Sequence, residues 1–215
     1  MHRRGVAWDC GTGSGQAAVA LAELVDFVIA TDASAGQLAA ARRHEQVRYV
    51  RAPAENAPIA TATADLVTAA QALHWFDTRA FFEEARRVLV PGGVIAVWCY
   101  DLPSIGPAVD ETLHHYYAHV VGPYWAPERR LVEDAYRAIE FPFDEVAVAP
   151  LEIAAGVTLD EFLGYVGTWS ATLARAADRM ERPVDRLREA LAADWPDPDE
   201  RRVARWPLWV RAGRV

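Results

Sequence analysis

A glycine-rich segment followed by an acidic residue is the clearest chemical pattern in the sequence. Residues 8–15 read WDCGTGSG, and Asp32 stands at the end of the next predicted strand. Glycines let a ligand come close to the backbone, and the free N–H groups of a following helix bind a carboxylate or a phosphate. A carboxylate after the next strand can bind ribose hydroxyls. A tight turn would explain the glycines alone, but together with Asp32 they predict a site for a nucleotide-type cofactor.

The spacing of these glycines discriminates between cofactors. A dinucleotide-binding fingerprint reads G-x-G-x-x-G. Here Gly11, Gly13 and Gly15 alternate after Asp9, and Gln16 occupies the place of the fingerprint's last glycine. This register disfavours a nicotinamide dinucleotide, although an NAD-dependent oxidoreductase stays an alternative.

Polar side chains also follow the fourth and fifth predicted strands, where a ligand of an open α/β sheet binds. Gln71 and His74 come after the fourth strand, and Tyr100 ends the fifth. His74 is a candidate general base, since imidazole exchanges a proton near neutral pH. The alternative is a packed histidine that orders the loop around Trp75, because the sequence offers His74 no carboxylate partner. We assign His74 and Tyr100 as the candidate catalytic residues.

A metal centre is not expected. His115 and His119 share one helical face, with His114 beside them, but Tyr116 follows His115, so no H-E-x-x-H arrangement exists and no third ligand is evident. The neighbouring aromatic residues are predicted to form a lid or the core of an insertion.

These residues require a scaffold of alternating strands and helices. Apolar runs predict strands at 6–9, 27–31, 47–50, 65–70 and 94–100, with helices at 16–24, 34–43 and from 78 to the Pro-Gly-Gly at 91–93 between them. Nearly continuous apolar strands that alternate with helices predict an α/β fold, with a doubly wound parallel sheet covered on both faces.

The second half of the chain is less regular. Helices are expected at 107–121, 128–139, 159–177 and 183–193, and strands at 146–153 and 202–211. The Pro- and Gly-containing stretch 101–107 is interpreted as the start of an insertion. We therefore expect one domain over 1–215, with a cofactor-binding core at 5–100, a helical insertion or lid at 104–140, and strands and helices at 141–215 that complete the sheet and the acceptor pocket.

Composition excludes several classes of function. The chain has 215 residues, a net charge of -8 and a pI near 5.3, so nucleic acid is not an expected partner. No long uncharged apolar run predicts a membrane span, and the apolar stretch before Asp9 is too short for a signal peptide, so we expect a cytoplasmic protein. All basic residues are arginine, which excludes a Schiff-base lysine and a Walker lysine. Cys10 and Cys99 cannot form a disulfide framework.

The register D-x-G-x-G-x-G at 9–15 resembles the first motif of the class I S-adenosylmethionine-dependent methyltransferases, of the methyltransferase type 11 domain. The segments 64–77, 97–101 and 167–171 are similar to a narrower group, the trans-aconitate methyltransferase-like proteins. Residues 84–93 look like the helix and turn before the family's fifth strand, and 52–55 like its adenine-side loop, where Pro53 replaces an aspartate that many members carry.

The resemblance implies a Rossmann-like, mostly parallel, seven-stranded sheet with a helical insertion after the fifth strand. It implies a set of residues that bind S-adenosyl-L-methionine: Asp9, Gly11, Thr12, Gly13, Gly15, Asp32, Ala33, Ala54, Glu55, Gln71 and Trp75. Near the last segment it implies an acceptor site, for which the candidates are Trp169, Ser170 and Arg175. A packed aromatic and a solvated arginine are the alternatives there.

The implied activity is methyl transfer to a small-molecule acceptor, with O-methylation of an acidic or hydroxylated metabolite as the leading hypothesis. In-line displacement from a sulfonium needs positioning and exclusion of water more than acid–base chemistry. Relatives carry a helical segment before the first strand, whereas here the core begins near residue 5. A non-catalytic protein that binds S-adenosylmethionine therefore stays an alternative, and both a monomer and a homodimer are compatible with the sequence.

Overall fold

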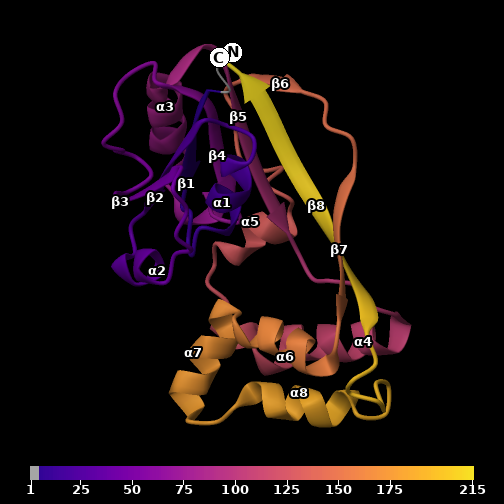
Figure 1. Cartoon of the computed structure of the whole chain (residues 1–215). Helices are drawn as coiled ribbons and strands as arrows, with labels where there is room; N and C mark the ends of the chain where they lie inside the picture. Colours follow the sequence, from indigo (N-terminus) through magenta and orange to yellow (C-terminus); the bar gives the residue numbers. More distant parts are fainter. Residues whose placement is uncertain (1–4) are drawn as a thin grey trace. The chain divides into compact units, whose positions relative to one another are not determined.

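The structure is a computed structural model that describes residues 5–215, and it divides them into two compact units (Figure 1). The first, here called the sheet unit, contains residues 5–100, Leu131–Pro150 and Trp209–Val215. The second, here called the helical unit, contains Asp101–Arg130 and Leu151–Leu208. The helical unit thus begins directly after the fifth strand, and the expected segments 104–140 and 141–215 each contribute to both units.

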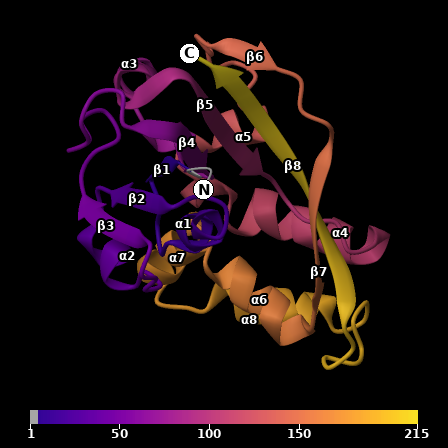
Figure 2. The ribbon, with the colours of Figure 1, turned by 45° about the horizontal axis from the view of Figure 1, so that its top comes forward.

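Five parallel strands form the sheet as the sequence predicts. They are β1 (Val6–Cys10), β2 (Phe27–Asp32), β3 (Val47–Arg51), β4 (Ala64–Ala70) and β5 (Leu89–Tyr100). The strand order is β3-β2-β1-β4-β5-β8-β6, in which β8 (Arg202–Arg214) runs antiparallel to the short β6 (Asp144–Val146) and lies next to β5 (Figure 2).

This path contains seven strands, and an eighth, β7 (Leu151–Val157), pairs with the beginning of β8. The order reverses between β1 and β4, which is the switch point of a doubly wound sheet, where ligands bind at the carboxyl ends of the strands. The α/β, Rossmann-like fold class is confirmed.

Side chains alternate between the two faces of β1, and each face has its own core. Ala7 packs on one side with Ala18 and Leu21 of α1 (Gln16–Ala22). Trp8 packs on the other side with Phe81 of α3 (Thr78–Val88), and its indole N–H donates to Thr31. Both faces of β1 are therefore buried, which explains its continuous apolar sequence.

Three helices differ in length from the prediction or depend on a cap. Asp77 caps α3 by accepting from the N–H of Ala80. The helix α2 (Ala35–Ala39) is capped by Ser34 but ends before the predicted 43. The helix α5 (Arg129–Glu133) stops well before 139, because Ala135 and Tyr136 adopt positive φ angles of 54° and 59°.

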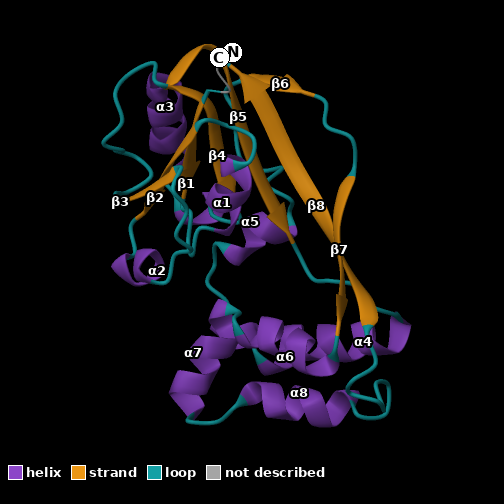
Figure 3. Cartoon of the chain, in the orientation of Figure 1, coloured by secondary structure: helices purple, strands orange, loops and turns teal. Residues whose placement is uncertain are grey.

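The helical unit is built from several short helices around its own core (Figure 3). They are α4 (Pro107–His115), the π-helix η2 (Tyr116–Val120), the 3₁₀ helix η3 (Gly122–Tyr124), α6 (Leu159–Gly167), α7 (Ser170–Arg179) and α8 (Pro183–Leu191). The helix predicted over 159–177 is broken at Thr168 and Trp169, since Trp169 has an extended backbone. In the part of the chain that the structure describes, no helix is both long and apolar enough to cross a membrane.

Candidate active site

The three glycines of the loop have different surroundings, although all have positive φ angles of 56–79°. A Cβ atom on Gly11 would lie 2.6 Å from Ala72, and one on Gly15 would lie 2.1 Å from the hydroxyl of Tyr49. A Cβ atom on Gly13 would meet nothing nearer than Gln37, at 3.9 Å. Packing within the chain therefore requires Gly11 and Gly15, whereas the space beside Gly13 is open for a ligand.

Asp9 is fully buried at the end of β1. Its carboxylate accepts hydrogen bonds from the hydroxyls of Thr12 at 2.6 Å and Thr68 at 2.7 Å. Burial raises the pKa of Asp9 to about 6, and these two hydrogen bonds only partly oppose it, while the nearby charge of Asp32 raises the pKa further. The position thus holds a negative charge that the protein alone stabilises poorly.

Asp32 joins the glycine loop to the end of β2. One carboxylate oxygen accepts from the N–H of Gly13 at 2.9 Å and the other from the N–H of Ser34 at 2.8 Å. Each oxygen keeps a second lone pair, so the half-buried carboxylate can still accept from two hydroxyls. The adjacent Ala33 uses its carbonyl to accept from Arg51.

The segment after β4 lies against the glycine loop, as the short distances from Gly11 to Ala72 and Phe76 show. Gln71 has a positive φ of 52°. Its side-chain amide donates to the carbonyl of Tyr100 and accepts from the N–H of Tyr100, both at 3.0 Å. The cofactor contact that the sequence predicts for Gln71 stays a prediction. In the structure its amide braces β4 against β5 and fixes the backbone of Tyr100.

His74 is 8% exposed, and the structure supplies the partner that the sequence did not reveal. Its Nδ1 atom lies 2.9 Å from the hydroxyl of Tyr136. Trp75 packs next to the imidazole ring and is 56% exposed, which is unusual for tryptophan in a folded domain. Among the remaining predicted cofactor residues, Ala54 is buried in the same core cluster as Trp8 and Cys10. Glu55 accepts from the N–H of Asp77 and so joins the loop after β3 to the segment after β4.

The predicted acceptor residues all belong to the helical unit. Trp169 packs with Tyr116, Tyr117 and Trp125, whereas Ser170 is exposed at the start of α7. Arg175 is 15% exposed at its side chain and donates to Glu181 at 2.6 Å. It is therefore a half-buried, ion-paired arginine and not the solvated one considered as the alternative.

Arg129 is a residue of this unit that the sequence analysis did not single out. Its guanidinium lies 4.9 Å from the ring centre of Trp125 and 5.4 Å from that of Tyr117, and it pairs with Asp101. The signal available in the sequence was only one more Arg-Arg pair, which is typical of a solvated surface.

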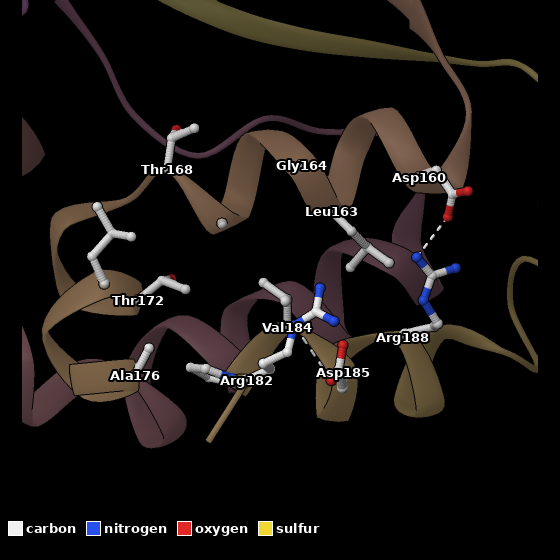
Figure 4. Close-up of a pocket in the computed structure, with 13 residues that line it drawn as sticks. Asp160, Leu163, Gly164, Thr168, Thr172, Ala176, Arg182, Val184, Asp185 and Arg188 are labelled. Atoms are coloured by element: carbon white, nitrogen blue, oxygen red, sulfur yellow. Dashed lines mark hydrogen bonds and ion pairs between the residues drawn. The ribbon is translucent and has the colours of Figure 1, made fainter. Parts of the chain in front are cut away.

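A cavity of about 480 Å³ lies between α6, α7 and α8 (Figure 4). Thr172 and Ala176 line it from one side of α7, four residues apart, and Thr168, directly after α6, lines it as well. Trp169, Ser170 and Arg175 do not belong to its lining, because helical periodicity directs them elsewhere. Ion pairs from Arg188 to Asp160 and from Arg182 to Asp185 stand at its rim.

Metal-ligating residues do not cluster anywhere in residues 5–215: no group of three or more His, Cys, Asp or Glu side chains could hold an ion. The rings of His115 and His119 are 4.9 Å apart, and no third ligand from this described part joins them.

Comparisons with known proteins identify the class. A family model described as a methyltransferase domain matches residues 8–97, which contain the glycine loop, Asp32 and the segment after β4. A protein of Dictyostelium discoideum named as a methyltransferase is 35% identical over 201 residues, which cover 92% of this chain and 76% of that protein. A solved structure from Anaeromyxobacter dehalogenans, described as a type II methyltransferase, is 43% identical with a TM-score of 0.88 and covers 98% of this chain and 90% of that one.

A further relative shares only part of the chain. The malonyl-[acyl-carrier protein] O-methyltransferase of Dechloromonas aromatica is 36% identical over 111 residues, which cover 52% of this chain and 40% of that protein.

A doubly wound sheet with an acidic, glycine-lined site at its switch point defines a nucleotide-cofactor enzyme of the Rossmann-like class. The matches over the whole chain then specify the family: the chain belongs to the class I S-adenosylmethionine-dependent methyltransferases. It is an enzyme whose cofactor is S-adenosyl-L-methionine, and the family assignment decides against the NAD-dependent oxidoreductase.

Proposed function

We propose that the enzyme transfers the cofactor's methyl group to an oxygen of a small acidic molecule, with a hydroxylated molecule as the second choice. The cofactor site belongs to the sheet unit, and the residues that recognise the acceptor belong to the helical unit.

The charge and shape of the glycine-loop site support the cofactor assignment. S-adenosylmethionine carries two positive charges, on its sulfonium and ammonium groups, and two ribose hydroxyls. Asp32 has free lone pairs for the hydroxyls, and the open space beside Gly13 allows the cofactor to approach the backbone. Asp9 adds negative charge that a cationic ligand would favour. We assign Gly11, Thr12, Gly15, Ala33, Ala54 and Glu55 to the frame of the same site.

The observation that supports an acidic acceptor is the incomplete hydrogen bonding of the Arg175 guanidinium. Its Nη2 atom donates to Glu181, yet its Nε atom is buried and has no hydrogen-bond partner among the residues that the structure describes. The indole N–H of Trp125 is in the same condition. A buried donor without an acceptor costs about 1–3 kcal/mol, so such donors call for an explanation in a native fold. A carboxylate oxygen of a bound acceptor would satisfy such a donor, and Trp169 packs against Trp125.

The comparison with the Dechloromonas protein supports an acidic acceptor as well. Its name gives malonyl-[acyl-carrier protein] and O-methylation, so that relative modifies a carboxyl group. The resemblance of segments 64–77, 97–101 and 167–171 to trans-aconitate methyltransferases agrees with the same class.

Such a reaction makes few chemical demands on the protein. When bound, the cofactor supplies a methyl group that already carries an activated leaving group. An ionised carboxylate attacks without loss of a proton, so the side chains need only bind, orient and keep out water. A hydroxyl acceptor would need a base, for which His74 is the candidate, with Tyr100 as the second candidate catalytic residue.

The test measures transfer from methyl-labelled cofactor to small molecules of matched shape, each offered as a carboxylic acid, a primary amide and an alcohol. A methyl ester is hydrolysed by alkali and releases volatile methanol, whereas an ether or an N-methyl group is stable. We expect alkali-labile label with the acids alone, and no label with Asp32→Ala, which lacks the ribose-binding carboxylate. Alkali-stable transfer to an alcohol would select the hydroxylated class, and transfer to nitrogen or carbon would contradict O-methylation.

A further inference from the structure

The strand β7 of the helical unit has a free edge on the side away from β8. In the described part of the chain β7 pairs with β8 alone, from Leu151 opposite Leu208 to Val157 opposite Arg202. An unpaired edge offers backbone N–H and C=O groups to another strand, and proteins usually block it with proline, charged side chains or a bulge. The strand β7 has a regular register, no proline and a single charged residue, Glu152.

The hydrogen bonds of β8 show which backbone groups of β7 point outward. The N–H and C=O groups of Arg205 both bond with Ser104, at 2.9 and 2.8 Å, so they point away from β7. The direction of these groups alternates along an antiparallel pair. Ala154 lies opposite Arg205, so its N–H and C=O groups point away from β8, as do those of Glu152 and Gly156.

The side chains of β7 are mostly apolar, and two large ones are exposed. Leu151 is 49% exposed and Ile153 is 40% exposed. Val157 projects to the same face of the strand and packs against the core of the helical unit. An edge strand with exposed apolar side chains is a typical site of association with another chain.

The sequence of β7 is complementary to a second copy of itself. When two copies pair antiparallel about Ala154, that residue lies opposite its own copy. Ile153 then lies opposite Ala155 of the second copy, and Leu151 opposite Val157. In this register the outward-pointing residues of one copy face those of the other, as a hydrogen-bonded ladder requires. The pairing has a twofold axis, so it closes at a dimer.

Charge complementarity favours a second copy over an unrelated chain. In the same register Glu152 lies opposite Gly156 of the second copy. The guanidinium of Arg201 donates to the carbonyl of Gly156, and its Nε atom is 3.7 Å from where a Cβ atom of Gly156 would lie. Opposite residues of an antiparallel pair project to the same face. Glu152 of each copy therefore meets Arg201 of the other, and the carbonyl of Gly156 keeps a second lone pair for the ladder.

The ion pairs within each chain are compatible with this contact. Glu152 pairs with Arg205, and Arg201 pairs with Glu161 at 3.0 Å. All four side chains are about half exposed, so each pair has room for a further partner. Association would join the two pairs into a network of four charges, which contributes more than an isolated surface pair.

We propose that a second copy of this chain binds along the free edge of β7, antiparallel about Ala154, and forms a twofold dimer with Glu152–Arg201 ion pairs between the copies. Leu151 of each copy then lies beside Val157 of the other and is shielded from water. This interface is independent of the acceptor, and it selects the homodimer from the two states that the sequence left open.

Sedimentation at several protein concentrations measures the association. One strand pair is a small interface, so we expect a reversible dimer with a dissociation constant in the micromolar range. Ala154→Pro removes an outward N–H group but no bond to β8, and should weaken association at least about tenfold. Ala154→Ser keeps the N–H group and should dimerise like the wild type. A wild type that stays monomeric well above the micromolar range, or undiminished dimerisation of Ala154→Pro, would overturn the proposal.

A disulfide between the copies tests the register. In the proposed dimer Ala154→Cys places two thiols opposite each other, with Cα atoms about 5.5 Å apart, which a disulfide can bridge. In Ala155→Cys the two positions are diagonal, about 7–8 Å apart, which is too far. The natural Cys10 and Cys99 are buried. We expect mild oxidation to cross-link Ala154→Cys alone, and any other outcome contradicts the register.

Exchange of the two charges tests the ion pairs. Glu152→Arg and Arg201→Glu each place like charges opposite each other in their own dimers, so both should associate more weakly than the wild type. A mixture of the two variants has opposite charges at both contacts, and we expect it to form a heterodimer at least about tenfold tighter than either variant alone. A mixture that associates no better would overturn the contact. Unchanged binding of S-adenosylhomocysteine verifies that each variant is folded.

Discussion

The two candidate sites of the molecule use charge in opposite ways. In the sheet unit, Asp9 is buried among hydroxyl groups and Asp32 holds the glycine loop through backbone N–H groups. In the helical unit, Arg129 and Arg175 lie over aromatic rings, and each is paired with one carboxylate. The candidate cofactor site therefore has an excess of acceptors, whereas the candidate acceptor residues supply donors. Two buried donors of the helical unit, on Arg175 and Trp125, have no partner among the described residues.

This difference matches the two proposed ligands. A cationic cofactor with hydroxyl groups requires carboxylates, and an anionic acceptor requires N–H donors. A substitution at either site should therefore affect the binding of one ligand and leave the binding of the other unchanged. Three predictions use this separation, from the largest expected effect to the smallest.

Substitutions at two glycines of the loop should affect different properties, which are the stability of the fold at Gly15 and the binding of the cofactor at Gly13. Gly15→Ala should destabilise the fold by about 4 kcal/mol, because its Cβ atom collides with Tyr49 and φ is positive. Gly13→Ala has space for its Cβ atom and should cost only about 1 kcal/mol. Urea unfolding measures both stabilities.

The affinity for the cofactor is the second quantity to measure in Gly15→Ala and Gly13→Ala. Titration with S-adenosylhomocysteine should show weaker binding in Gly13→Ala, since its methyl group fills the open space. Undiminished affinity in that variant would remove Gly13 from the proposed cofactor site.

The raised pKa of Asp9 predicts how the free energy of unfolding of the ligand-free enzyme depends on pH. Its pKa is raised from 3.8 to about 6 in the folded state, so between these values the folded state binds more protons than the unfolded state. Stability should therefore fall as pH rises from about 4 to about 6, by up to about 3 kcal/mol, and stay level above this range. Asp9→Asn should lack this loss, as measured by urea unfolding at several pH values.

The exposed Asp144 of β6 provides the control for that measurement. Asp144→Asn should follow the wild-type pH dependence. If Asp9→Asn follows it as well, the buried carboxylate does not account for the loss.

Arg175 tests the helical unit. Arg175→Met keeps a long side chain but removes the donors, and we expect the KM of the acceptor to rise about tenfold while cofactor affinity is unchanged. Arg186→Met is matched, because Arg186 is the other partner of Glu181 and is 62% exposed. Equal effects of the two variants on KM would assign the result to Glu181 and not to the acceptor.

Local patterns in the sequence were sufficient to predict the strands and the glycine loop of the cofactor-binding part of the chain, residues 5–100. The strands β1 to β5, the alternating glycines and Asp32 could be predicted, because a buried parallel strand, a tight turn and a following carboxylate each leave a signal within a few residues. The break between α6 and α7 could not, since apolar periodicity continues through Thr168 and Trp169 while the packing of Trp169 ends the helix.

Hydrogen bonds and packing contacts between residues far apart in the sequence could not be predicted either. Gln71 was interpreted as a ligand-binding residue, yet its amide binds the backbone of Tyr100, 29 residues away. Arg129 belongs to one of several Arg-Arg pairs in the sequence, a pattern typical of a solvated surface, but the fold places it on Trp125. Neither sequence spacing nor composition encodes which atoms satisfy a polar group.

The sequence by itself determined the class of the protein: a doubly wound sheet, an acidic glycine loop and a methyltransferase that uses S-adenosylmethionine. Only the tertiary structure decided what each polar side chain does. It separated Gly13 from Gly11 and Gly15, buried Asp9 and paired His74 with Tyr136. The physical reason is that backbone conformation and apolar patterning are local properties, whereas hydrogen-bond partners, burial and the pKa values that follow from them depend on segments that meet only after folding.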